Sequence, residues 1–268
     1  MRFLTLLLLS LLLNSANGQD VAEAVLKKPV KKINKPADFI TTDRLGNLYV
    51  VNSNDIWMYN RDGDSLRAFN TKRYGEIHFV DCSDPYQILV FFKDFNVILY
   101  LDNFLSENGP PRDMQELGFD QATLVCLSQE TGFWVFDQLR QKAMRLDANF
   151  RVTHETVNFI QWFGRRLEPN YMEQYNNRLY LNEPESGIYV FDHFGTYIKK
   201  IPIKGLKNPQ MLEKVISYVE DNTYCNFKLM ELERQCDSLK VEKVYGARKE
   251  KGRFYMHSDR GIEIFKTN

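Results

Sequence analysis

The sequence has few cysteines and histidines, four of each in 268 residues. No two cysteines form a CxxC pair, and the cysteine and histidine spacing matches no zinc-binding pattern. The sequence also lacks a GxSxG nucleophile motif, a phosphate-binding glycine loop and an HExxH helix. These absences remove the usual sequence evidence for a serine hydrolase, a nucleotide-binding enzyme or a zinc enzyme. We therefore expect a non-catalytic chain, with an enzyme as the alternative.

Net charge is also absent, because 35 Lys and Arg residues balance 35 Asp and Glu residues. A neutral chain has no overall field that would attract nucleic acid, so we expect no nucleic-acid partner. The most basic stretch, Leu26 to Lys35, alternates lysine with apolar residues. This alternation favours an edge strand whose outward lysines prevent edge-to-edge association. A polyanion-binding tail is the alternative interpretation.

Long apolar runs are absent except at the N-terminus, where Phe3 to Leu13 follows the basic Arg2. The run is too short to span a bilayer, and the small residues Ala16 to Gly18 resemble a cleavage site. We predict a signal peptide over residues 1–18 and a single domain over residues 19–268. The protein is then exported, with the periplasm as the expected compartment and an extracellular or outer-membrane-associated location as alternatives.

Sustained helical periodicity is absent as well, and a strand–turn–strand unit recurs in its place. Asn, Asp and Gly mark the turns, and aromatic and β-branched residues fill the strands. The residues that close the second strand of each unit are spaced 35–45 positions apart: Asn60, Asp102, Asp147, Asp192, Glu231 and Lys266. A period of about forty residues with several short strands is typical of a β-propeller blade. The sequence therefore predicts an all-β, six-bladed propeller.

Closure of the ring is predicted from the two ends of this pattern. The last unit stops at Asn268 after its third strand, and Ala24 to Ile33 is left over at the start. We expect this N-terminal strand to pair into the last blade and remove its free edge. The predicted inner strands are Asp38–Asp43, Glu76–Ser83, Ala122–Ser128, Tyr171–Tyr175, Pro209–Val215 and Val241–Ala247.

The first unit resembles a blade of NHL-type six-bladed propellers. Its matching positions are Pro36, Asp43, Gly46, Asn47, Tyr49, Val50, Asn60 and Gly63, and the fourth unit continues the likeness through Phe191, Asp192 and Gly195. The whole chain also resembles exported propellers of Gram-negative bacteria without an assigned activity. The resemblance implies a fold, and a propeller fold does not determine function.

Five acidic or amide residues lie at or next to the predicted starts of inner strands: Asp38, Glu76, Asp120, Asn170 and Asn208. In a propeller such positions converge on one mouth of the central channel. Their oxygen atoms suit calcium, which takes six to eight such ligands. Lactonase-type six-bladed hydrolases are similar in placing an acid and amides around a central metal. The alternative interpretation is that these residues cap turns and line a polar channel, with no cofactor bound.

The segment from Asn158 to Tyr171 combines aromatic residues with arginine, the residue types that dominate binding hot spots. We predict a binding surface here, formed by Phe159, Trp162, Phe163, Arg165 and Arg166. The alternative is a longer outer strand or a short helix that simply packs under the blades.

The four cysteines divide into two pairs. Cys225 and Cys236 lie symmetrically about a predicted turn, so a disulfide across a hairpin is expected in an oxidising compartment, with free thiols as the alternative. Cys82 and Cys126 lie within apolar strands and are predicted to be buried thiols.

The leading functional hypothesis is a non-catalytic module that binds or scaffolds another envelope protein or complex. No membrane span is expected, and any association with a membrane would be peripheral, through a partner. The alternative is a calcium-dependent lactonase-like or esterase-like hydrolase at the channel mouth. Glycan binding through exposed aromatic residues is a third hypothesis, which the sequence does not separate from the first.

Overall fold

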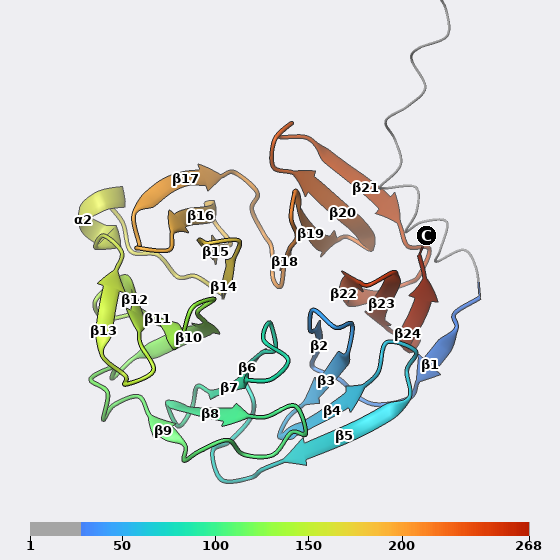
Figure 1. Cartoon of the computed structure of the whole chain (residues 1–268). Coiled ribbons are helices and arrows are strands. Elements are labelled where there is room, and N and C mark those ends of the chain that lie inside the picture. The colour runs from blue at the N-terminus through green and yellow to red at the C-terminus, as the bar shows by residue number, and fades with distance from the viewer. Residues whose placement is uncertain (1–27, 268) are drawn as a thin grey trace, which may run out of the picture.

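The computed structural model describes residues 28–267, which form a closed ring of six four-stranded antiparallel sheets (Figure 1). The six-bladed propeller predicted from the sequence is therefore confirmed. In each blade one strand lies innermost, along the central channel, and the next three follow outward. The predicted signal peptide, residues 1–18, lies outside the described residues.

The blades follow one another along the chain. Blade 1 contains β2 (Phe39–Thr42), β3 (Leu48–Asn52), β4 (Asp55–Tyr59) and β5 (Ser65–Asn70). Blade 2 contains β6 (Phe79–Asp81), β7 (Ile88–Phe92), β8 (Val97–Leu101) and β9 (Arg112–Asp113). Blade 3 contains β10 (Ala122–Leu127), β11 (Phe133–Asp137), β12 (Lys142–Leu146) and β13 (Val152–Glu155). A helix, α2 (Phe159–Phe163), precedes blade 4.

Blade 4 contains β14 (Tyr171–Tyr175), β15 (Arg178–Glu183), β16 (Gly187–Asp192) and β17 (Tyr197–Ile201). Blade 5 contains β18 (Gln210–Met211), β19 (Val215–Glu220), β20 (Thr223–Lys228) and β21 (Arg234–Ser238). Blade 6 contains β22 (Val244–Glu250), β23 (Arg253–Ser258) and β24 (Gly261–Lys266), and β1 (Lys31–Ile33) completes it.

The N-terminal strand closes the ring as predicted. β1 runs antiparallel to β24, with Lys31 opposite Ile264 and Ile33 opposite Ile262. Blades 6 and 1 are also joined by the Tyr255 hydroxyl, which donates to the carbonyl of Gly46 at 2.7 Å. The strand itself is shorter than the predicted Ala24–Ile33, and residues 24–27 of that range lie outside the described residues.

The Asp or Asn residue that closes the third strand in four of the blades stabilises the turn that follows it. The Asp102 carboxylate accepts hydrogen bonds from the backbone N–H groups of Phe104 and Ser106, at 2.8 and 2.9 Å. Asn60, Asp147 and Asp192 accept the corresponding pairs of bonds at the ends of the third strands of blades 1, 3 and 4. This side-chain bonding to a turn backbone explains why the residue type persists although other identities drift.

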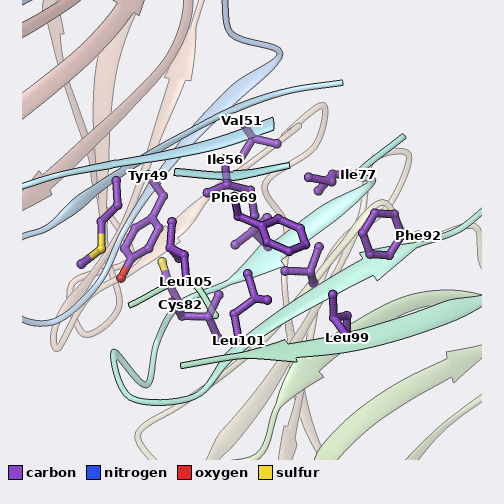
Figure 2. Packing of buried hydrophobic residues seen from close by; sticks show 14 residues of the cluster. Tyr49, Val51, Ile56, Phe69, Ile77, Cys82, Phe92, Leu99, Leu101 and Leu105 are labelled. Atoms are coloured by element: carbon purple, nitrogen blue, oxygen red, sulfur yellow. The ribbon is translucent and has the colours of Figure 1, made fainter. Parts of the chain in front are cut away.

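The hydrophobic core lies between neighbouring blades. One cluster joins blades 1 and 2, with Tyr49, Val51 and Ile56 facing the wholly buried strand β7 (Figure 2). Burial of each large apolar side chain contributes about 1.5–3 kcal/mol, so these contacts hold the blades in place.

Blade 5 departs from the predicted pattern. Its inner strand is only Gln210–Met211, because Leu212 donates to the carbonyl of Val215 at 2.9 Å in a tight turn, and Val215 already begins β19. The third strand ends at Lys228, so Glu231 lies in the following turn instead of closing the strand.

Candidate functional site

Polar side chains link the inner strands around the channel. Asp81 in blade 2 accepts a hydrogen bond from the Leu127 N–H in blade 3 at 2.7 Å. Gln210 in blade 5 both donates to and accepts from the backbone of Lys249 in blade 6, at 3.1 and 2.9 Å. An inner strand has a free backbone edge, and these bonds satisfy part of it. The polar residues of the inner strands therefore have a structural role between blades.

The channel holds a cavity of about 590 Å³. Phe79 of blade 2 and Tyr171 of blade 4 both line this cavity and pack edge to face, with ring centres 5.7 Å apart. The Tyr171 hydroxyl donates to the Glu173 carboxyl at 2.7 Å, and burial raises the pKa of Glu173 to about 7. Burial also raises the pKa of Asp81, although two backbone N–H groups favour its ionised form. Both carboxyls are held where charge is poorly solvated.

A buried arginine lies in the same cavity wall. Arg248 donates to the side-chain oxygen of Asn208 at 2.6 Å and to the Asn208 carbonyl at 3.2 Å. Its guanidinium also lies close enough to Glu173 to favour the ionised carboxylate, but this effect is smaller than that of burial. The channel thus carries charges of both signs.

The five predicted calcium ligands do not assemble into one site. Asn170 and Asn208 line the channel cavity, whereas Asp38, Glu76 and Asp120 do not. Asp38 and Glu76 both bond Ser53, through its backbone N–H at 2.7 Å and its hydroxyl at 3.3 Å. Across residues 28–267, no group of three or more His, Cys, Asp or Glu side chains lies where it could hold a metal ion. Turn bonding accounts for these contacts.

The segment between blades 3 and 4 is an insertion. The connection from β13 to β14 spans residues 156–170, nearly twice the length of the corresponding connections 71–78, 114–121 and 202–209 and three times the length of 239–243. Its short helix, α2, begins after Asn158, whose side chain accepts the Gln161 N–H, and ends at Gly164 in the left-handed region at a φ of 71°. Both termini are therefore capped by residue types suited to them.

Two aromatic residues fix α2 to the ring. Phe159 is fully buried and stacks between Phe136 of blade 3 and Phe191 of blade 4, with ring centres 5.8 and 5.6 Å away. Phe163 packs against Tyr189 and Tyr197 of blade 4, at 4.7 and 5.2 Å. The helix therefore fills the groove between the two blades.

Hydrogen bonds fix the rest of the insertion. The fully buried Gln141 side chain accepts the Leu167 N–H at 2.7 Å and donates to the Leu167 carbonyl at 3.2 Å. Arg166 donates to the carbonyl of Gln138 at 2.7 Å, and Arg165 pairs with the buried Glu183. The insertion is thus tied to blades 3 and 4 at several points along its length.

The predicted binding residues consequently separate into two groups. Phe159 and Phe163 point into the ring, so of the three predicted aromatic residues only Trp162 presents its ring to solvent, at 60% exposure. Ile160 is 41% exposed beside it, and Leu139 is exposed in the β11–β12 turn that bonds the insertion. The sequence analysis missed Ile160 and Leu139. The spacing of Phe159, Trp162 and Phe163 places all three on one helix face, so the sequence held no signal that separates the exposed Trp162 from the two inward-facing rings.

The cysteines occupy the expected elements. Cys225 and Cys236 lie opposite each other on β20 and β21 and form a disulfide. Cys82 and Cys126 are buried free cysteines, and burial raises the pKa of both thiols. Among residues 28–267, no helix has the length and apolar character needed to cross a bilayer.

Comparison with known proteins identifies a fold and no family. No protein-family model matches the chain, and no curated protein matches its sequence. Similar solved structures include a streptogramin B lyase (13% identity, TM-score 0.61, 88% of this chain and 96% of that chain). The Pan2 WD40 domain of Neurospora crassa is similar at 12% identity and a TM-score of 0.57, covering 87% and 89%. Virginiamycin B lyase from Staphylococcus aureus is similar at 11% and 0.57, covering 85% and 79%. Likeness at this level of identity shows a shared propeller fold and carries no activity with it.

Proposed function

We propose that this propeller is a non-catalytic binding or scaffolding module that docks another protein of the bacterial cell envelope through the 156–170 insertion. The observation that carries the proposal is the presentation of Trp162. Its helix is fixed from below by Phe159 and Phe163, yet the indole is 60% exposed. The helix that carries Trp162 is thus anchored while its large apolar ring remains open to a partner, and covering that ring would bury a large apolar area.

Preorganisation gives this arrangement a physical use. A backbone segment that is already fixed loses little conformational entropy when a partner binds it. Tryptophan and arginine are enriched among the few residues that contribute most to protein–protein binding energy. Trp162, Ile160 and Arg166 lie on one short, well-fixed segment, with Leu139 on the turn that bonds it. This surface has the composition of a small binding epitope.

Site-specific photo-crosslinking in the native cells tests the proposal. A benzophenone amino acid at position 162 is expected to give a discrete covalent adduct with one envelope protein. The matched control places the same group at position 86, because Tyr86 is equally exposed on another part of the ring. Absence of an adduct at position 162, or the same adducts at both positions, would contradict the proposal.

Export is part of the proposal and rests on the sequence of residues 1–18. The expected compartment is the periplasm, and any membrane association is expected to pass through the partner protein. The finer likeness to NHL-type propellers rests on the turn residues of blades 1 and 4. Fractionation of cells that express the chain with and without residues 1–18 checks the compartment, since only the complete chain should leave the cytoplasm.

The calcium-dependent hydrolase has less support, because only Asn170 and Asn208 of its five proposed ligands reach the channel cavity. Thermal unfolding in calcium and then in chelator distinguishes the two functions. A calcium-binding site should raise the melting temperature in calcium, whereas the docking proposal expects the same value in both buffers.

A further inference from the structure

The central channel contains a buried cation that no carboxylate contacts directly. Arg248, on β22, lines the channel cavity and is only 4% exposed. Its two hydrogen bonds both go to the neutral Asn208 and use two of its five N–H donors. Among residues 28–267 it forms no ion pair. Buried charges are ordinarily paired, so this guanidinium has unused capacity for an anionic group in the cavity.

A carboxyl group lines the same cavity. Glu173, on β14, accepts a hydrogen bond from the Tyr171 hydroxyl at 2.7 Å and one from the backbone of Met211. A carboxylate has about four acceptor positions, so two of them remain for a further donor. Arg248 acts on Glu173 electrostatically, yet the two groups do not form an ion pair. The cavity therefore presents two opposite charges that are not in contact with each other.

Aromatic rings line the cavity beside these charges. Phe39, Phe79 and Tyr175 all contribute to its wall, and each remains partly exposed. The strands β6, β14 and β22 belong to alternate blades, so Phe79, Glu173 and Arg248 approach the channel from three directions (Figure 1). A ligand in the channel would consequently meet an aromatic surface, a carboxylate and a guanidinium together.

The cavity has the size and the access that a small ligand needs. Its volume of about 590 Å³ lies within the range of about 300–1,000 Å³ that is usual for small-molecule pockets. The exposed residues Arg44 and Gln129, in the turns after β2 and β10, belong to its lining. The cavity thus reaches the surface of the ring, and a ligand can enter without unfolding a blade.

We propose that the channel cavity binds a small zwitterion with an aromatic side chain, either an aromatic α-amino acid or a dipeptide that ends in one. The ligand carboxylate bonds Arg248, its ammonium group bonds Glu173, and its ring packs against the partly exposed aromatic residues. An anion without the ammonium group would be repelled by Glu173 and Asp81, and a cation without the carboxylate would be repelled by Arg248. A ligand that carries both charges satisfies both groups.

Isothermal titration calorimetry of the purified chain at pH 7.5 tests the proposal. The probes are L-phenylalanine and L-alanyl-L-phenylalanine, and at least one of them should bind with a dissociation constant between about 1 µM and 1 mM. The tighter of the two identifies the length of the ligand. Phenethylamine lacks the carboxylate and 3-phenylpropionate lacks the ammonium group, so each should bind about tenfold or more weakly than L-phenylalanine.

The replacement Glu173→Gln supplies the decisive arm, because it removes the charge and keeps the shape of the side chain. It should weaken binding of the zwitterion about tenfold or more. The same variant should bind 3-phenylpropionate at least as tightly as the parent does, because the repulsion is removed. Glu116→Gln, which changes an exposed carboxyl outside the cavity, is the matched control and should bind every probe as the parent does. No binding of either probe at about 10 mM, equal binding of a single-charge analogue, or unchanged zwitterion binding by Glu173→Gln would overturn the proposal.

Discussion

The replacement Glu173→Gln should make the propeller more resistant to heat at neutral and mildly alkaline pH. Burial raises the pKa of Glu173 from 4.5 to about 7 in the folded protein. A carboxyl with a raised folded-state pKa binds its proton more tightly when folded than when unfolded. Its stabilising contribution is therefore complete below about pH 4.5 and is lost as the pH rises through about 7. Glutamine does not ionise, so the variant should escape this loss.

The magnitude follows from the size of the shift. A difference between 4.5 and about 7 corresponds to ~3 kcal/mol of unfolding free energy. For a domain of this size each kcal/mol moves the melting temperature by roughly 2–4 °C. The variant should therefore melt about 6–12 °C above the parent at pH 8 and close to it at pH 4.5. The amide oxygen of glutamine can still accept the bond from the Tyr171 hydroxyl.

The assay is the melting temperature of both proteins from pH 4.5 to pH 8, analysed as the difference between them. The difference isolates Glu173 from other groups. His78 and His257 have pKa values lowered by burial, so their protonation destabilises the fold toward low pH. Glu116→Gln, which changes an exposed carboxyl, is the control and should show no such trend. A difference that stays flat, or that grows toward acidic pH, would refute the reasoning.

Three further predictions concern the architecture, each checked by urea unfolding. Gly195→Ala should lower the free energy of unfolding by about 1–3 kcal/mol, because a Cβ at this position would lie 2.6 Å from the carbonyl oxygen of Glu155. Gly109→Ala is the control and should lower it by less, because Gly109 has a similar positive φ but no atom within 4 Å of the added Cβ. Phe159→Ala should cost about 3–5 kcal/mol, because the ring is fully buried between two blades; a loss below about 1 kcal/mol would show that α2 does not anchor the insertion. Cys225→Ala with Cys236→Ala should cost about 2–3 kcal/mol for a loop of 11 residues, and reduction of the parent should match that loss.

The sequence was sufficient for the fold because the determining signals are local. A carboxylate such as Asp102 or Asp192 bonds its own turn, so its position in the repeat is readable without knowledge of the tertiary structure. The strand boundaries of blade 5 were predicted less accurately. The tight turn at Leu212 shortens the inner strand, and Glu231, which was expected to close the third strand, lies in the turn after it. The repeat pattern therefore predicts strand boundaries poorly in a blade whose turns differ from those of the other blades.

The candidate site was readable only in part, because it depends on contacts between blades. The sequence alone identifies the aromatic residues of the insertion but does not show which of them are buried. Phe159 is buried because it stacks between Phe136 and Phe191, which lie in different blades. Glu173 is a similar case. It reads as a polar residue in an ordinary strand, and its raised pKa arises only when the ring encloses it.

The pairing of β1 with β24 makes the last event of folding depend on both ends of the chain. Lys31 pairs with Ile264 across almost the whole sequence, so a growing chain carries β1 before its partner strand β24 has been made, and a chain without β1 leaves the outer side of β24 uncovered. Such a chain exposes an unpaired strand, which invites aggregation and proteolysis. The ring therefore cannot close until the last strand has been synthesised, which is a property that the proposed export of the chain would use, since an exported polypeptide crosses the membrane before it folds.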